Sequence, residues 1–114
     1  MKETAKLFKA LSDPNRLRIL KMLEKRTLCV CEITDVLNLA TSTVSKHLSI
    51  LKESELIVEE KNGKWVDYSL NTTTENKRVK EFLNNLDLWI VDEQIVKIDY
   101  IAACCVDRNL VCCK

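Results

Sequence analysis

Residues 38–52 read NLATSTVSKHLSILK, and this stretch decides the fold of the chain. Val44, Leu48 and Leu51 recur at i, i+4 and i+7, the spacing of an apolar stripe on one face of a helix. The stretch contains no Asp or Glu, although the chain has 17 acidic residues, and a helix that faces phosphate needs such a local absence of negative charge. The alternative is a solvated helix face of ordinary composition. We expect a DNA-contacting helix, with contacts at Thr41, Ser42, Thr43, Ser45, Lys46, His47 and Ser49.

Two helices are expected near the N-terminus. Apolar residues at helical spacing place the first between Thr4 and Leu11. Asp13 can cap the second, and Pro14 suits its first position. The inward residues of this second helix would be Leu17, Leu20 and Leu23, with Arg16, Arg18, Lys21 and Lys25 on its wetter faces.

A third helix is expected from Cys29 to Leu37, with residues 38–40 as the turn that follows it. Thr41 or Ser42 would cap the DNA-contacting helix after the turn. Two helices joined by so short a turn form a helix-turn-helix unit.

A β-hairpin is expected after the DNA-contacting helix. The only glycine of the chain, Gly63, follows Asn62, and this pair is the strongest short signal for a hairpin turn. Val66, Tyr68 and Leu70 alternate on the return strand. Lys61 and Lys64 flank the tip, and this basic tip would lie along the DNA backbone or reach the minor groove. A helix-turn-helix followed by such a wing is a winged helix, so the expected fold is mostly α with a small β-hairpin.

A long helix capped by residues 72–74 is expected to follow and to carry Val79, Phe82, Leu83, Leu86 and Ile90. With the first helix it has more apolar surface than one small core requires, so we expect a homodimer. Two DNA-contacting helices about one DNA turn apart would then bind an inverted repeat in double-stranded DNA. The expected division is a winged helix-turn-helix unit with flanking dimerisation helices over residues 1–92 and a cysteine-rich tail over residues 93–114.

Composition fits an ordinary protein of one domain. The chain has 114 residues, of which 46% are apolar and 31% charged, and a net charge of +1, so DNA contact must come from a local basic patch. The N-terminus lacks the apolar run of a secretory signal, and no apolar stretch is long enough to span a membrane. We expect a cytoplasmic protein without a membrane partner, in which thiols stay reduced.

Six cysteines in that compartment favour metal binding or redox chemistry over a disulfide framework. Cys29 and Cys31 lie just before the DNA-contacting helix, and soft thiolates suit thiophilic ions. Because residues two apart on a helix do not share a face, this pair can bind one ion together only if the start of the third helix is extended or distorts on binding. The alternatives are two small buried residues and, for the C-terminal cysteines, a loose tail. The second candidate cluster is Cys104, Cys105, Cys112 and Cys113.

Four motifs together resemble the ArsR–SmtB family of winged-helix repressors. Residues 10–20 are similar to its opening signature, residues 42–48 to its recognition helix, residues 63–70 to its wing and residues 28–33 to the cysteine box of its arsenic-sensing branch. The resemblance covers roughly residues 4–90. It implies a homodimeric repressor that occupies the promoter of its own operon and leaves it when a toxic metal or metalloid binds.

The inducer that this resemblance implies is trivalent arsenic, or antimony, without an organic cofactor. Thr34 stands where many members carry a third cysteine, and arsenic prefers three thiolates, so the C-terminal cysteines are a second site or the source of the missing ligand. A repressor of the same fold that responds to cadmium, lead or thiol oxidation is the alternative, and a structural zinc in the tail remains open. The family's zinc site uses His and carboxylates on the last helix, but residues 75–101 contain no His. A thiol enzyme is disfavoured, because the chain has no Cys-x-x-Cys motif and a single glycine.

Overall fold

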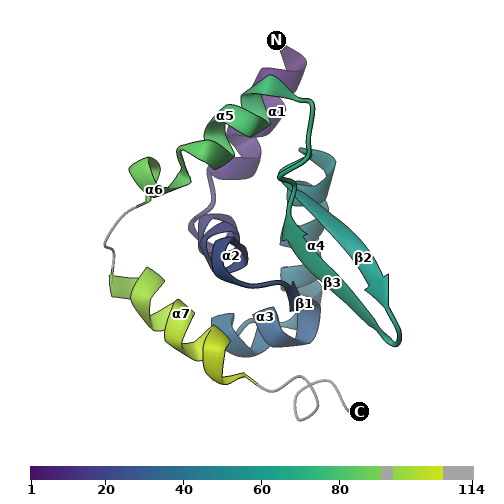
Figure 1. The fold of residues 1–114 in the computed structure, drawn as a ribbon, viewed down its shortest axis with the longest axis vertical. Helices are drawn as coiled ribbons and strands as arrows, with labels where there is room; N and C mark the ends of the chain where they lie inside the picture. Colours follow the sequence, from purple (N-terminus) through teal and green to yellow (C-terminus); the bar gives the residue numbers. More distant parts are fainter. Residues whose placement is uncertain (91–93, 107–114) are drawn as a thin grey trace.

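The computed structural model describes residues 1–90 and 94–106. It is mostly helical, and α2 lies at its centre, with α1 and α5 together at one end, α3 and α7 towards the other, and α4 and the hairpin along one side (Figure 1). In chain order the elements are α1 (Lys2–Leu11), α2 (Pro14–Lys25), β1 (Leu28–Cys29), α3 (Val30–Leu37), α4 (Thr41–Glu53), β2 (Ile57–Asn62), β3 (Trp65–Leu70), α5 (Lys77–Asn84), α6 (Leu86–Trp89) and α7 (Gln94–Cys105).

The start of α2 follows the sequence closely. The Asp13 carboxylate accepts hydrogen bonds from the backbone N–H groups of Asn15 at 2.8 Å and Arg16 at 3.3 Å, and Pro14 is the first helical residue. The prediction that Arg16 and Lys21 lie on wetter faces was wrong, because both side chains are buried. Long basic side chains bury their aliphatic stems while the charged ends bind polar partners, and alternation of apolar residues does not reveal this.

The helix-turn-helix unit consists of α3 and α4. Asn38 adopts a left-handed conformation with φ of 56°, which ends α3 and turns the chain towards α4. The predicted caps of α4 were wrong, because its N-cap is the extended residue Ala40, which has no side-chain hydrogen bond to offer. The predicted apolar stripe is confirmed, since Val44, Leu48 and Leu51 are at most 1% exposed.

The wing is part of a three-stranded antiparallel sheet with the order β1-β3-β2. The sequence predicted two of these strands and missed β1, in which Leu28 pairs with Tyr68 and Cys29 with Asp67. Cys29 is therefore extended and precedes α3, rather than beginning that helix. The hairpin turn also lies one residue later than predicted, because Asn62 pairs with Trp65 and only Gly63, with φ of 64°, is left-handed in the turn.

The C-terminal half differs most from the prediction. Asn76, not residues 72–74, caps α5, and the single long helix is interrupted at Asn85 before the short α6. Residues 94–105 form α7, which packs against α2 and α3 and buries Val96 and Ala103. The described part of the predicted tail therefore contributes to the core, while the division at residue 92 stays a prediction.

One main core joins α1, α2, α3, α4 and the sheet, and includes Ile19, Leu20, Met22, Ile33 and Leu56, each fully buried. None of the helices in the described ranges combines the length and the apolar character that crossing a bilayer requires.

Candidate nucleic-acid interface and thiol cleft

The DNA-facing side chains predicted on α4 lie on one exposed surface. Thr41, Ser42, Thr43, Ser45, Lys46 and Ser49 are all exposed, while the opposite face of the helix is buried in the core. Small hydroxyl groups allow a helix to approach the edges of bases and the phosphates closely. The helix N-terminus adds the positive end of its dipole to this surface. The geometry therefore suits a recognition helix.

His47 differs from the other predicted contacts, because its half-buried ring lies against Arg16. Arg16 Nη1 is 3.1 Å from His47 Nδ1, and because a guanidinium can only donate, Nδ1 would be the acceptor of this hydrogen bond. Arg16 also donates through Nε to the Ala10 carbonyl at 2.7 Å and through Nη2 to the Lys9 carbonyl at 3.1 Å. One buried guanidinium thus joins the end of α1 to the recognition helix. This role of Arg16 was not predicted, because Arg16 and His47 are 31 positions apart in the sequence.

The wing presents two exposed cations, Lys61 and Lys64, as predicted from the hairpin. Lys64 Nζ lies 4.7 Å from the centre of the Trp65 ring, a cation–π distance. Lys52, near the end of α4, forms an ion pair with Glu59 of β2, which joins the recognition helix to the wing. The hydrogen bond from Lys52 lowers the pKa of Glu59 below its usual value.

Cys29 is the N-cap of α3 and takes part in a capping box with Glu32. The Cys29 N–H donates to Glu32 Oε1 at 2.9 Å, and the Cys29 side chain accepts from the backbone N–H of Glu32. Cys29 is 2% exposed and Glu32 is fully buried, whereas Cys31 is half-buried on the first turn of the helix. The thiol of Cys29 therefore lies at a helix N-terminus, within a strand that is paired with the wing.

Both cysteines line a cleft of about 310 Å³. Its walls come from the cysteine box, the recognition helix and the wing, so three separate elements meet around it. Tyr68 is half-buried at this cleft, and its burial, followed by its interaction with Glu59, raises its pKa. The lining residues are Cys29, Val30, Cys31, Ser45, Lys64, Trp65, Val66 and Tyr68.

Of the C-terminal cysteines that the structure describes, neither Cys104 nor Cys105 lines this cleft. Cys104 and Cys105 are exposed at the end of α7, while Cys112 and Cys113 lie outside the described residues. Over residues 1–90 and 94–106, no cluster of three or more His, Cys, Asp or Glu side chains is placed to hold a metal ion. The described residues thus offer a two-thiol site rather than a three-thiolate one.

Two arginines nevertheless connect α7 to the rest of the site. Arg26 donates to the Ala103 carbonyl in the last turn of α7 and, at 3.4 Å, to Glu32 of the capping box. Arg18 holds the buried Asp99 with two hydrogen bonds of 2.9 Å. These contacts were not predicted, because residues 77 and 81 positions apart give no local pattern in the sequence.

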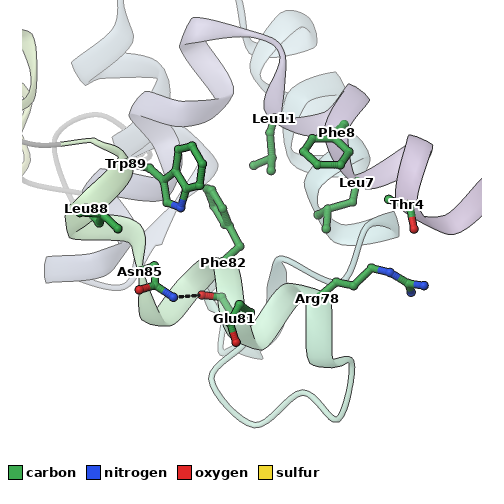
Figure 2. Close-up of a pocket in the computed structure, with 10 residues that line it drawn as sticks. All are labelled: Thr4, Leu7, Phe8, Leu11, Arg78, Glu81, Phe82, Asn85, Leu88 and Trp89. Carbon is green, nitrogen blue, oxygen red and sulfur yellow. Dashed lines mark hydrogen bonds between the residues drawn. The ribbon is translucent and has the colours of Figure 1, made fainter.

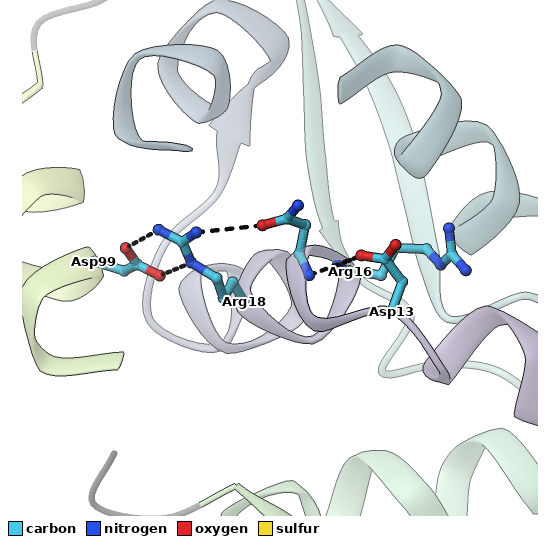
Figure 3. A network of polar contacts seen from close by, with 5 residues as sticks. Asp13, Arg16, Arg18 and Asp99 are labelled. Atoms are coloured by element: carbon cyan, nitrogen blue, oxygen red, sulfur yellow. Dashed lines mark hydrogen bonds and ion pairs between the residues drawn. The ribbon is translucent and has the colours of Figure 1, made fainter. Parts of the chain in front are cut away.

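The Asp99 contact continues into α2 and its N-cap (Figure 3). Arg18 Nη1 donates to the side chain of Asn15 at 3.2 Å, and the Asn15 backbone donates to Asp13, which also caps the N–H of Arg16. The hydrogen bond to Asp99 is the main cause that raises the pKa of Arg18. A continuous set of polar contacts therefore runs from α7 to the residue that holds His47.

A family model described as "Bacterial regulatory protein, arsR family" matches residues 13–58, which contain α2, α3 and α4. An uncharacterised HTH-type transcriptional regulator of Methanocaldococcus jannaschii, MJ1325, is 41% identical over 86 residues, which are 75% of this chain and 92% of that protein. The arsenical resistance operon repressor of Staphylococcus xylosus is 39% identical over 94 residues, 82% of this chain and 86% of that one.

The fold also matches solved structures. Reduced HlyU from Vibrio cholerae is 30% identical and superposes with a TM-score of 0.65, covering 80% of this chain and 92% of that one. The identity over most of a relative's length, the family model and the winged helix agree with one another. The chain belongs to the ArsR family of DNA-binding transcriptional regulators, which are not enzymes.

Proposed function

We propose that this protein is a repressor that leaves its operator when a thiophilic inducer binds Cys29 and Cys31. The observation that supports the proposal is the cleft, in which both thiols lie between the recognition helix and the wing. Trivalent arsenic, with antimony as its closest chemical analogue, is the proposed inducer, because soft trivalent ions favour thiolates. The arsenical repressor of S. xylosus, 39% identical, supports the same ligand class.

Binding at Cys29 is coupled to the position of the wing. Cys29 is 2% exposed, and its strand is held on β3 by pairing with Asp67. A ligand that bridges Cys29 and Cys31 must open this short strand or move the wing away from it. The ligand would also lie next to Ser45 on the DNA-facing surface. Either change lowers the fit of the wing and recognition helix to DNA.

The proposed DNA contacts are those predicted from the sequence on α4 and at the wing tip. The exposed hydroxyls and Lys46 of α4 suit a groove of the duplex, and Lys61 and Lys64 suit the phosphate backbone. His47 would contribute through Nε2, because Arg16 occupies Nδ1. Because a repressor acts in the compartment that contains its operator DNA, the proposal includes a cytoplasmic location for this protein.

We also propose a homodimer formed through α1, α5 and α6. A hollow of about 540 Å³ opens between these helices, with Phe8, Phe82 and Trp89 on its walls (Figure 2). Three large apolar side chains here are exposed to solvent: Phe8 at 67%, Leu88 at 74% and Trp89 at 70%. A monomer rarely exposes such a group of apolar side chains to water. A second copy would cover these side chains and place two recognition helices to bind an inverted repeat.

The test is the double variant Cys29→Ser/Cys31→Ser, measured by fluorescence anisotropy of labelled operator DNA with and without arsenite. The variant should bind the operator like the natural protein and should not release it, since serine hydroxyls do not replace soft thiolates. Titration with antimonite, cadmium and lead establishes which thiophile acts. Normal release by the double variant would contradict the proposal and would point to the C-terminal cysteines.

A redox response is the second candidate, and the exposure of Cys104 and Cys105 favours it, because oxidants reach exposed thiols first. Operator release by hydrogen peroxide but by none of the metal ions would support this candidate. Mass spectrometry of the released protein would then identify the oxidised cysteines.

A further inference from the structure

We infer that the cleft is built for a trivalent arsenical that carries one organic substituent, rather than for inorganic arsenite. This inference rests on the proposed function, because it specifies the ligand of the same two thiols. The first observation is the number of sulfur ligands. The described lining of the cleft contains Cys29 and Cys31 but not Thr34, which stands at the position where many family members carry a third cysteine.

Thr34 does not supply an alternative ligand to the cleft. Its hydroxyl oxygen is buried and has no hydrogen-bond partner among the described residues. The end of α7 presents Cys104 and Cys105 to solvent instead of to the cleft. Arsenite bound by two thiols keeps one As–OH group, which any third thiol in solution can exchange. An organoarsenical has a stable As–C bond in that place and needs only two sulfurs.

The reaction balances without an oxidant or a reductant. A compound R–As(OH)₂ and two Cys–SH groups give R–As(S–Cys)₂ and two water molecules. Two As–O and two S–H bonds break, two As–S bonds form, and the protons leave in the water. Arsenic remains trivalent throughout, and the R group remains attached.

The second observation is the apolar part of the lining that the two thiols share. Val30, Trp65 and Val66 give the cleft an apolar side, and the half-buried Tyr68 adds a second aromatic ring. An aromatic substituent stacked against such rings gains affinity beyond the area it buries. The volume of about 310 Å³ is at the lower end of the range for small-molecule sites, which suits a compact substituent. Ser45 at the same cleft places the substituent beside the DNA-facing surface.

The experiment compares phenylarsine oxide with arsenite in operator release. It uses the full-length chain with Cys104, Cys105, Cys112 and Cys113 changed to Ser, so that only Cys29 and Cys31 can react. The phenyl compound should release the operator at a concentration about tenfold or more below that of arsenite, a difference of about 1.4 kcal/mol.

The chain offers a matched pair of wing variants for the apolar wall. Val66, 37% exposed, lines the cleft, and Val58, 40% exposed, does not. Val66→Ala should weaken the response to phenylarsine oxide about three- to tenfold and leave the arsenite response unchanged, whereas Val58→Ala should change neither. Direct binding gives a readout without DNA, since a change in tryptophan emission on adding phenylarsine oxide should disappear in Trp65→Phe.

The outcomes separate the two proposals. Equal potency of both arsenicals, or a phenyl preference that Val66→Ala retains, overturns the inference and leaves the proposed function standing. Release by arsenite alone does the same. If neither arsenical, nor antimonite, cadmium or lead, releases the operator from the natural protein, the proposed function itself fails.

Discussion

Replacement of Arg16 by Met should destabilise the protein by about 3 kcal/mol. Arg16 is 9% exposed and makes hydrogen bonds to the Lys9 and Ala10 carbonyls and to His47. Those carbonyls belong to the last turn of α1, and the Lys9 carbonyl also accepts hydrogen bonds from the Ser12 N–H at 3.2 Å and from the Ser12 hydroxyl at 2.7 Å. A hydrogen bond to a charged group contributes about 1.5–3 kcal/mol to stability. The three hydrogen bonds of one side chain are not additive in full, so we expect a total loss of about 3 kcal/mol.

The conservative variant Arg16→Lys should lose about half as much. Its single ammonium group cannot reach two carbonyls and a ring nitrogen in the fork geometry of a guanidinium. Urea unfolding followed by circular dichroism measures both changes at one fixed protein concentration, because a dimer unfolds in a concentration-dependent way. Exposed Lys97 provides the control, and Lys97→Met should stay within about 0.5 kcal/mol of the natural protein.

Nitrogen NMR of the imidazole tests the same contact directly, since the chain has one histidine and gives one set of ring signals. In the natural protein the Nδ1 signal of His47 should carry the signature of a hydrogen-bond acceptor, and Arg16→Met should lose this signature. A loss below about 0.5 kcal/mol in Arg16→Met, together with unchanged ring signals, would refute the view that Arg16 joins α1 to the recognition helix.

Three further predictions concern single side chains. Thr34→Val should stabilise the protein by about 1 kcal/mol in urea unfolding, because it removes a buried hydroxyl without a partner among the described residues; a loss of stability would mean that the hydroxyl has one. Burial and a hydrogen bond to Glu24 raise the pKa of Tyr100 to about 12, so the folded state holds the phenolic proton more tightly than the unfolded state, and stability should fall as pH rises from about 10 to 12. Tyr100→Phe should lack this decline, and absorbance of tyrosinate measures the titration. The lowered pKa of Glu59 has the opposite sign: its contribution to stability is present above the unfolded pKa and is lost as pH falls through the folded pKa. Glu59→Gln and Lys52→Met should both lack this acid-side loss of stability, and carboxyl NMR of Lys52→Met should show that the pKa of Glu59 is no longer lowered.

Much of the DNA-binding unit could be predicted because its signals are local. Val44, Leu48 and Leu51 repeat at helical spacing, Asp13 and Pro14 mark a helix start, and Gly63 marks a turn. Each of these depends on residues within one or two turns of one another. The structure therefore confirms the recognition helix and the wing.

The missed features depend on partners distant in sequence. A strand of two residues, Leu28 and Cys29, shows no alternation, and only its pairing with β3 makes it a strand. The buried Lys21 binds not only Glu24, three positions away, but also Asp87, 66 positions away. The break at Asn85 divides an apolar pattern that continues across it, so periodicity alone predicted one helix. The two-thiol cleft could be expected only in part, because its wall comes from the wing.

The placement of the cleft between two DNA-contacting elements has a reciprocal effect. If the ligand lowers the affinity of the repressor for its operator by a given factor, the operator lowers the affinity of the repressor for the ligand by the same factor, because the two binding free energies share one coupling term. Repressor bound to its operator should therefore have a lower affinity for the ligand than repressor that is free in solution. Induction would then proceed chiefly by capture of molecules that have already dissociated, so its speed would follow the residence time of the repressor on DNA.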